Sequence, residues 1–414
     1  MVAPAPNWMR FRMYQVGFGD CFLLTLRYPD PIEGSRSERH VLIDCGTSKL
    51  PPDHPGIVSV AKQIAADCDG QLDAVIVSHR HKDHLSAFGH ATAGELLAGL
   101  RPKLVVRSWT EDPKADPNAD SPDAALLQDL KRGQATAGRL VRSLQAAGRG
   151  TRTDLFKFAA AEVSNAPAVK RLDRMSANGR GDYLHARKQP RRLARLLPGV
   201  GVSVIGPPRP RDWPAVARQA ANSKEYWLGA RQQIERRLSE GSIDAEPGPL
   251  RWLVSHLRES DTGALMSLVR WLDDSLNNTS LILLLSVGEH RILLGGDAQI
   301  ENWSWALEQK TIGPDLDAVD LYKVGHHGSR NGTPISLFER WRAVRPKRRF
   351  ISLMSTLPGV HGHGERTVPR VRLVDALGTL GDVVSTHQIE APYVDIVSDL
   401  PKGRLRLKRA KLPS

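Results

Sequence analysis

The sequence predicts an α/β fold, a sandwich of β-sheets and helices with a long helical region in its middle. Short apolar runs rich in β-branched residues alternate with helical patterns toward both ends of the chain. From Asp120 to Leu276, apolar residues instead recur mainly at helical spacing. Alternating strands and helices form sheets covered by helices, and 41% apolar residues in a chain of 414 suffice for a core.

The N-terminal part is expected to form strands and turns with one helix. Its clearest segments are a helix from Ile57 to Ala66 and two strands, Leu72 to Val77 and Leu104 to Trp109. A returning strand follows from Val202, ended by the prolines that precede Arg209. The C-terminal elements are a hairpin, a helix and three strands, at Ser280–Val287 with Arg291–Gly295, Glu301–Leu307, Asp320–Val324, Ile351–Met354 and Val383–Ser385.

These elements predict a core that is split by insertions. The core is expected to comprise two separate stretches joined by a returning strand, while the insertions are basic and mainly helical. The predicted core consists of 1–111 and 277–400 with strand 201–208, the insertions of 112–200 and 209–276, and a basic C-terminal tail of 401–414.

The chain is strongly basic, with 58 Lys and Arg residues against 45 Asp and Glu and a net charge of +13. Basic pairs stand out between Lys131 and Arg195, and the C-terminal tail adds more. Such a field attracts polyanions and can contact phosphates, so a nucleic-acid partner is expected. The alternative is an arginine-rich composition whose charges only solvate the surface.

Other features of the sequence exclude several protein classes. No uninterrupted apolar run reaches about 18 residues, so no membrane span is expected. The first residues, up to Met13, lack the basic start and apolar centre of a secretory signal. The three scattered cysteines are too few for a disulfide scaffold or a thiolate metal site. We therefore expect a cytoplasmic protein, and the sequence points to no particular protein partner.

The most informative stretch runs from Ser78 to His84, directly after the strand that ends at Val77. It places three imidazoles and one carboxylate within six positions, at His79, His81, Asp83 and His84. Nitrogen and oxygen ligands clustered in this way suit Zn²⁺ and similar metals. Side chains two positions apart on an extended segment lie on the same side. The sequence therefore predicts a metal site, and the alternative is a histidine-rich surface loop.

This stretch matches the HxHxDH motif of the metallo-β-lactamase superfamily. Four other blocks resemble the subgroup that includes the metallo-hydrolase domain of the ComEC competence proteins, at Gln15–Leu24, His40–Gly46, Arg291–Ala298 and Leu321–Arg330. The resemblance implies an αββα sandwich whose metal site lies at the edge where the two sheets meet. Here the sandwich would carry large helical insertions that cap or flank the active-site cleft.

The resemblance also implies a pair of divalent metal ions. By it, His79 and His81 bind the first metal, and Asp83 and His84 turn toward the second. Asp297, which follows a strand and two glycines, would bridge both metals. In isolation Asp297 could instead cap the helix that follows it. The expected metal is Zn²⁺, with Mn²⁺ as the alternative.

One histidine of the pair His326 and His327 should complete the second metal site. Adjacent residues at a strand end point in opposite directions, so one ligand is expected. The slight preference is for His326, because it directly follows the strand and Gly325. Many superfamily members have another metal-binding histidine between the HxHxDH block and the bridging aspartate. No convincing counterpart is present, and Glu111 or Asp112 could substitute.

Three further residues are candidates for contact with the substrate. Ser329 and Arg330 could bind phosphate through a hydroxyl and a guanidinium group, or could form an ordinary polar turn. The block around Gly362 resembles a "GHP" segment of ComEC-like proteins. Within it, His363 is the candidate general acid, since imidazole titrates near neutral pH. The alternative is a histidine in a surface loop.

The predicted reaction is hydrolysis by a metal-activated hydroxide, with Asp83 orienting the hydroxide. The electrophile is open, because related folds hydrolyse several kinds of bond. The basic charge and the ComEC-like blocks favour a phosphodiesterase or nuclease acting on DNA or RNA. One alternative is a hydrolase of a small substrate such as a cyclic nucleotide, a phosphocholine ester or a lactone. Another is a non-catalytic metal-binding effector subunit of a larger complex.

Overall fold

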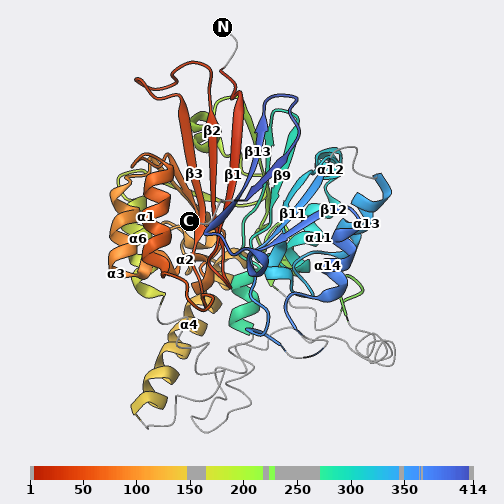
Figure 1. Cartoon of the computed structure of the whole chain (residues 1–414). Helices are drawn as coiled ribbons and strands as arrows, with labels where there is room; N and C mark the ends of the chain where they lie inside the picture. Colours follow the sequence, from red (N-terminus) through yellow and green to blue (C-terminus); the bar gives the residue numbers. More distant parts are fainter. Residues whose placement is uncertain are drawn as a thin grey trace.

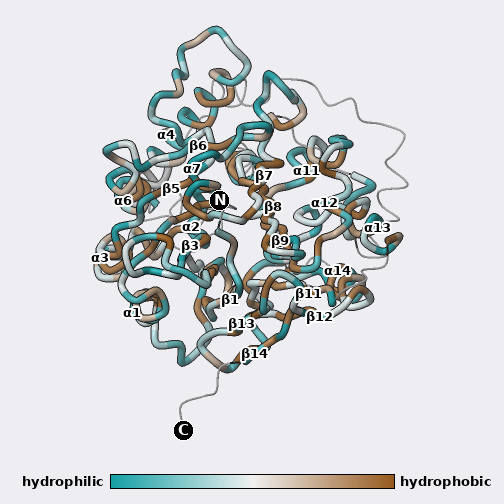
Figure 2. The backbone as a smooth tube through the Cα atoms, turned by 90° about the horizontal axis from the view of Figure 1, so that it is seen from above, coloured by the Kyte–Doolittle hydropathy of each residue, from teal (hydrophilic) through white to brown (hydrophobic). Residues whose placement is uncertain are grey.

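The computed structural model describes residues 4–146, 165–217, 223–228, 271–344, 349–362, 364 and 367–409. Two mixed β-sheets face each other, and helices cover their outer faces (Figure 1). The predicted α/β class is therefore confirmed. The layers follow one another as helices, sheet, sheet and helices, and the tube in Figure 2 shows α1, α3 and α6 on one flank and α12, α13 and α14 on the other.

The first sheet has eight strands in the order β14–β13–β1–β2–β3–β4–β5–β6. Its first four pairings are antiparallel up to β3, and the strands from β3 to β6 run parallel. The strands are β1 (Trp8–Tyr14), β2 (Cys21–Arg27), β3 (Glu38–Cys45), β4 (Ala74–Ile76), β5 (Leu104–Ser108), β6 (Gly181–Leu184), β13 (Tyr393–Asp399) and β14 (Arg406–Arg409). The C-terminal strands thus complete a sheet that the N-terminus begins.

The second sheet has six strands in the order β12–β11–β10–β9–β8–β7. The strands from β9 to β12 run parallel, whereas β7, β8 and β9 pair antiparallel. The strands are β7 (Val200–Gly206), β8 (Ile282–Val287), β9 (His290–Leu294), β10 (Leu321–Lys323), β11 (Phe350–Met354) and β12 (Gly381–Ser385). Every strand predicted for this half is present, including the hairpin that turns at Gly288.

Three apolar clusters hold the layers together. The largest lies between the sheets and is built from inward residues of both, such as Leu24, Ile43, Leu283 and Ile351. Helices α1 (Ile57–Asp67), α2 (Lys82–Gly89), α3 (Ala91–Gly99) and α6 (Ala166–Ser176) pack on the outer face of the first sheet. Helices α11 (Ile300–Glu308), α12 (Gly313–Asp317), α13 (Ile335–Val344) and α14 (Val371–Gly378) cover the second sheet. Burial of these faces is the main source of stability.

The predicted insertions contribute to both the helices and the first sheet. Helix α4 (Pro122–Ala146) packs with the helical residues 271–277 in a fourth apolar cluster, formed by Trp109, Leu126, Leu127, Leu130, Ala137, Leu272 and Leu276. Helix α7 (Arg191–Leu196) contributes Leu193 to the core between the sheets. Strand β6 was not expected in the first insertion, and it extends the first sheet beside β5.

The topology brings chemically active residues to one end of the two sheets. The segments that follow β4, β9 and β10 carry the HxHxDH stretch, Asp297 and the His326–His327 pair respectively. Asp44 lies near the end of β3, and Asp20 precedes β2, which is antiparallel to β3. All these positions therefore meet at the same sheet ends, although they are separated widely in sequence.

Candidate metal centre

The HxHxDH stretch is held in place by the turns beside it. The carboxylate of Asp44 accepts hydrogen bonds from the backbone N–H and the hydroxyl of Ser78, each 2.7 Å long. The N–H of Asp20 donates to the carbonyl of Asp83 over 2.9 Å. A Cβ atom on Gly46 would lie 2.5 Å from the backbone nitrogen of Leu85, so only glycine permits this approach. Backbone packing thus sets the path of the ligand loop.

Four side chains converge as one group of potential metal ligands, Asp83, His84, Asp297 and His327, with one ligand atom of each within 4.8 Å of the others. Nε2 of His84 lies 3.1 Å from Oδ2 of Asp297. Nε2 of His327 lies 2.9 Å from Oδ2 of Asp83 and 3.2 Å from Oδ2 of Asp297. Both Nε2 atoms are buried without a well-formed hydrogen bond. Two imidazole nitrogens and two carboxylates in this arrangement fit a divalent metal ion.

The other ring nitrogen of each histidine in this group has a hydrogen-bond partner. Nδ1 of His84 lies 2.9 Å from Oδ2 of Asp44, and Nδ1 of His327 donates to the carbonyl of Ser355 over 2.8 Å. These contacts satisfy Nδ1 of each ring and leave Nε2 facing the group. Partners of this kind orient histidine ligands in metalloproteins.

His79 and His81 form a neighbouring pair of nitrogen donors. Nε2 of His79 and Nδ1 of His81 face each other at 2.9 Å. Their outer nitrogens again lie near oxygen atoms, 3.1 Å from Oγ of Ser78 and 3.6 Å from Oδ1 of Asp273. Among the described residues, this pair belongs to no group of three or more candidate ligands. It is therefore a less complete site than its neighbour.

Electrostatics divide the four histidines into two kinds. Burial lowers the pKa of His327, but the carboxylates of Asp297 and Asp83 outweigh it and raise that pKa to about 10. Burial also lowers the pKa of His84, but the carboxylates of Asp297, Asp20 and Asp44 raise it well above its usual value. By contrast, burial lowers the pKa of His81 to about 4 and that of His79 well below its usual range. The latter pair is neutral at pH 7, which is the form that binds metals.

The structure places His327 in the group of four, contrary to the slight preference for His326. Both residues lie in a 3₁₀ turn, Gly325–Gly328, with left-handed backbone angles (φ 47° and 52°). They therefore do not alternate as neighbours on a strand do. Burial lowers the pKa of His326 to about 4, and its Nδ1 is buried without a hydrogen bond.

Neither acidic residue suggested for the first metal site lies free beside His79 and His81. Glu111 pairs with Arg107 and with Arg80, and these arginines hold its pKa below the usual value even though burial raises it. Asp112 accepts a hydrogen bond from the backbone of Lys114. The substitution by Glu111 or Asp112 stays a prediction, and for Glu111 a metal ion would have to compete with the two arginines that pair with its carboxylate.

The predicted substrate contacts have different surroundings. Ser329 is buried and donates to the side-chain oxygen of Asn331 over 2.9 Å. The guanidinium of Arg330 stacks on the ring of Tyr226, 5.0 Å from its centroid. His363 lies outside the described residues. These observations leave the phosphate-binding roles as predictions.

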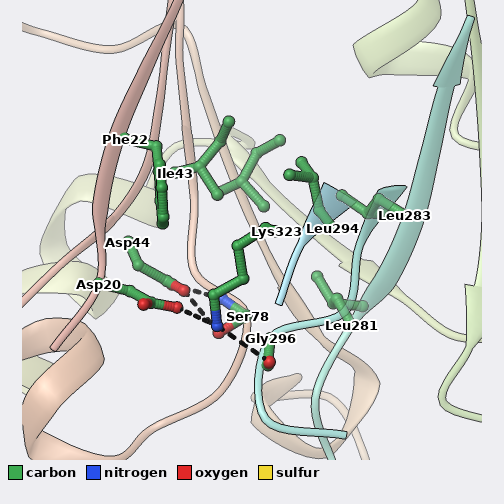
Figure 3. A pocket seen from close by; sticks show the side chains of 11 residues that line it. Asp20, Phe22, Ile43, Asp44, Ser78, Leu281, Leu283, Leu294, Gly296 and Lys323 are labelled. Carbon is green, nitrogen blue, oxygen red and sulfur yellow. Dashed lines mark hydrogen bonds and ion pairs between the residues drawn. The ribbon is translucent and has the colours of Figure 1, made fainter. Parts of the chain in front are cut away.

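Three site residues were missed in the sequence, although each lies in a block that resembles the ComEC-type proteins. Asp44 orients Ser78 and His84, and Asp20 contacts the amino group of Lys323. Figure 3 shows Lys323 reaching between Asp20 and Gly296. Lys323 lines a cavity of about 10 Å³ together with apolar side chains such as Phe22 and Leu294. A lysine and two aspartates in or beside ordinary strands carry no local signal of this role.

Two segments of the predicted insertions lie beside the centre. The side chain of Asn165, at the start of α6, donates to the carbonyl of Arg80 over 3.0 Å. The side chain of Gln299 donates to Asp274, in the helical residues 271–277, over 2.8 Å. Both insertions therefore contact the segments that carry the candidate ligands.

Comparison with known proteins leaves the functional argument to the site. No family model matches the chain, and no curated protein matches it. In the ranges that the structure describes, no helix is both long enough and apolar enough to cross a membrane.

Proposed function

We propose that this protein is a metal-dependent hydrolase with the αββα architecture of the metallo-β-lactamase superfamily. The convergence of Asp83, His84, Asp297 and His327 carries the proposal. Two facing sheets between helical layers, with ligands gathered at the sheet ends, also support it. Fold resemblance alone would not choose a reaction, so the chemistry is argued from the residues.

The proposed centre holds two divalent ions, with Zn²⁺ as the first choice and Mn²⁺ as the alternative. Asp83, His84, Asp297 and His327 would hold one ion, and His79 with His81 the other. Mixed imidazole and carboxylate ligands suit both metals. When bound, such ions supply Lewis acidity and lower the pKa of a coordinated water to about 7.

The protein's own side chains would position the reactants. The buried network around Asp44 keeps the imidazole of His84 in one tautomer, so its Nε2 faces the reaction site. Asp83 is the candidate for orienting the attacking water. Its carboxylate is less enclosed than that of Asp297, with the side chain 16% exposed against 2%. Asp83 therefore borders the accessible side of the group.

The proposed substrate is a phosphodiester bond in DNA or RNA. The net charge of +13 supports a polyanionic substrate, since cationic surfaces gain affinity by neutralising phosphates. Several basic side chains of the first insertion are exposed, namely Lys131, Arg132, Lys170 and Arg191. The insertion flanks the ligand loop, so such a surface would lie next to the centre. Ser329 and Arg330 remain the proposed phosphate contacts and His363 the proposed general acid.

The test is cleavage of labelled single- and double-stranded DNA, RNA, a cyclic nucleotide and a lactone by chelator-treated protein resupplied with Zn²⁺ or Mn²⁺. The Asp83→Ala and Asp297→Ala variants are compared with wild type and with Asp30→Ala, an exposed carboxylate as control. We expect metal-dependent nucleic-acid cleavage that falls at least about 100-fold in the two site variants and is unchanged in the control.

Three outcomes would redirect the proposal. Cleavage that survives both site substitutions would refute the assigned centre. Turnover of only the cyclic nucleotide or the lactone would favour the small-substrate hydrolase. Metal uptake without turnover of any substrate would favour the non-catalytic metal-binding effector.

A further inference from the structure

Lys323, at the end of β10, is a buried cation inside the proposed metal centre. Its side chain is 3% exposed, and its amino group contacts the carboxylate of Asp20. The same amino group donates to the carbonyl of Gly296 over 3.1 Å. A buried lysine is costly unless it is paired and hydrogen-bonded, and these two partners meet that need. They also fix the position of the charge, because both belong to tightly packed turns (Figure 3).

The amino group of Lys323 also approaches the carboxylate that the ligand set shares. It lies 3.4 Å from Oδ1 of Asp297. The other oxygen of that carboxylate, Oδ2, lies 3.1 Å from Nε2 of His84 and 3.2 Å from Nε2 of His327. Asp297 therefore divides its two oxygens, one toward the lysine and one toward the histidines.

This division matters because a carboxylate that bridges two metals has two oxygens to share. A fixed ammonium at Oδ1 competes with any second cation there by charge and by space. His79 and His81 then keep two nitrogen donors of their own and belong to no larger ligand group within the described ranges. The two halves of the centre are therefore unequal in their ligands.

A second cluster of candidate ligands, Asp20, Asp44 and His84, does not offer the missing site. Asp20 is paired with Lys323, and Asp44 accepts hydrogen bonds from Ser78 and contacts Nδ1 of His84. The carboxylate oxygens of Asp20 and Asp44 thus position Lys323, Ser78 and His84. A cation bound to these oxygens would have to displace those contacts.

We propose that Lys323 is a positioning residue that holds Oδ1 of Asp297 and so makes the two metal sites unequal. One divalent ion binds tightly at Asp83, His84, Asp297 and His327, and a second binds weakly at His79 and His81. This inference rests on the proposed metal centre. Beyond that centre, Lys323 would determine which of the two sites binds metal first.

The test is titration of chelator-treated, full-length protein with Co²⁺ and with Zn²⁺, followed by Co²⁺ absorption and by competition with a chromophoric chelator. Wild type is compared with Lys323→Met, Lys323→Arg and Lys103→Met, a control at a partly exposed lysine that pairs with Glu33. In wild type we expect two binding steps that differ at least about 10-fold in affinity. Lys323→Met should strengthen the second binding step and so remove most of the difference in affinity between the two steps. Lys323→Arg and Lys103→Met should leave that difference unchanged.

Two results would overturn the inference. One is wild-type protein that binds two ions with equal affinity. The other is a folded Lys323→Met variant, judged by circular dichroism, with an unchanged gap. If Lys323→Met does not fold, Lys323→Gln replaces it, because a neutral polar side chain also removes the ammonium from Oδ1 of Asp297. An unchanged gap in folded Lys323→Gln would count equally against the inference.

Failure of this inference can be told apart from failure of the proposed function. Unequal metal binding without turnover of any substrate would leave the inference standing and remove the hydrolase. Turnover by a protein that binds two metal ions with equal affinity would support the hydrolase and refute the inference about Lys323.

Discussion

At the residue scale, the centre is defined as much by the partners of its ligands as by the ligands. Each of the four histidines has its outer ring nitrogen near an oxygen atom, supplied by Ser78, Asp273, Asp44 and Ser355. Such partners fix the tautomer and the ring orientation, which makes the facing nitrogen a better ligand. The ligand geometry therefore depends on residues outside any metal-binding motif.

Asp44 gives the sharpest test of this dependence. Asp44→Ala removes the oxygen at Nδ1 of His84 and both hydrogen bonds of Ser78. We expect metal affinity to fall about 10- to 100-fold, measured by chelator competition, with Asp30→Ala as the control. Unchanged affinity in a folded Asp44→Ala protein would contradict the proposed role.

The two adjacent histidines should differ in their effect on metal binding. His327→Ala removes a nitrogen from the group of four, whereas His326→Ala removes a ring outside it. We expect the first substitution to weaken tight metal binding more than the upper limit of about 100-fold for outer partners, and the second to weaken it less. The reverse order, measured by the same competition, would restore the preference drawn from the sequence.

The sequence predicts ligands better than it predicts their partners. The stretch from His79 to His84 was recognisable because its spacing is set by local strand and loop geometry. Lys323 and Asp20 acquire their role only when β10 and the turn before β2 meet in space. The position of Glu111 in a suitable loop likewise does not reveal that Arg107 and Arg80 pair with its carboxylate.

At the scale of elements, the ligand loop is placed by backbone contact between turns. A methyl group on Gly46 would meet the backbone nitrogen of Leu85 at 2.5 Å, where no flexible side chain can yield. We expect Gly46→Ala to lower the free energy of unfolding by about 1–3 kcal/mol, measured by denaturant titration, and to weaken metal binding. Gly99→Ala is the matched control, since a methyl group there meets open space. Equal stability of the two variants would refute the constraint.

Elements with strong local patterns were predicted, and those with weak patterns were not. The helix from Ile57 and the hairpin through Gly288 have clear periodicity and turn residues, and both are present. Strand β6 is four residues long and lies in a region of helical pattern, so only its pairing with β5 makes it a strand. The final strands, β13 and β14, similarly depend on β1, which lies at the other end of the chain.

At the scale of the whole molecule, the proposed metal centre combines residues from two sheets that are built from distant parts of the sequence. Asp83 and His84 lie after strand β4 of the first sheet. Asp297 lies after β9 and His327 after β10, both in the second sheet. The unfolded chain does not hold these four groups together, so the free energy of metal binding contributes to folding. Metal saturation should therefore stabilise the entire fold and not only the loops.

Because protons compete with metal for His327, the stabilisation by metal should depend on pH. The pKa of His327 is raised to about 10 by Asp297 and Asp83, against the effect of burial. The stability that comes from its protonated form is fully present below the unfolded value of about 6.5 and is lost as pH rises toward 10. Metal must displace the same proton, so metal affinity rises over the same interval.

The difference in melting temperature between metal-loaded and chelator-treated protein should therefore widen between pH 6.5 and pH 9. At a free metal concentration 100 times the dissociation constant, the added stability is about 2.7 kcal/mol, and it grows as protons compete less. Differential scanning calorimetry at several pH values measures the difference. Asp30→Ala should follow wild type, while His327→Ala should lose both the metal-dependent gain and its rise with pH. A constant or narrowing difference in wild type would show that metal binding does not displace a proton from His327.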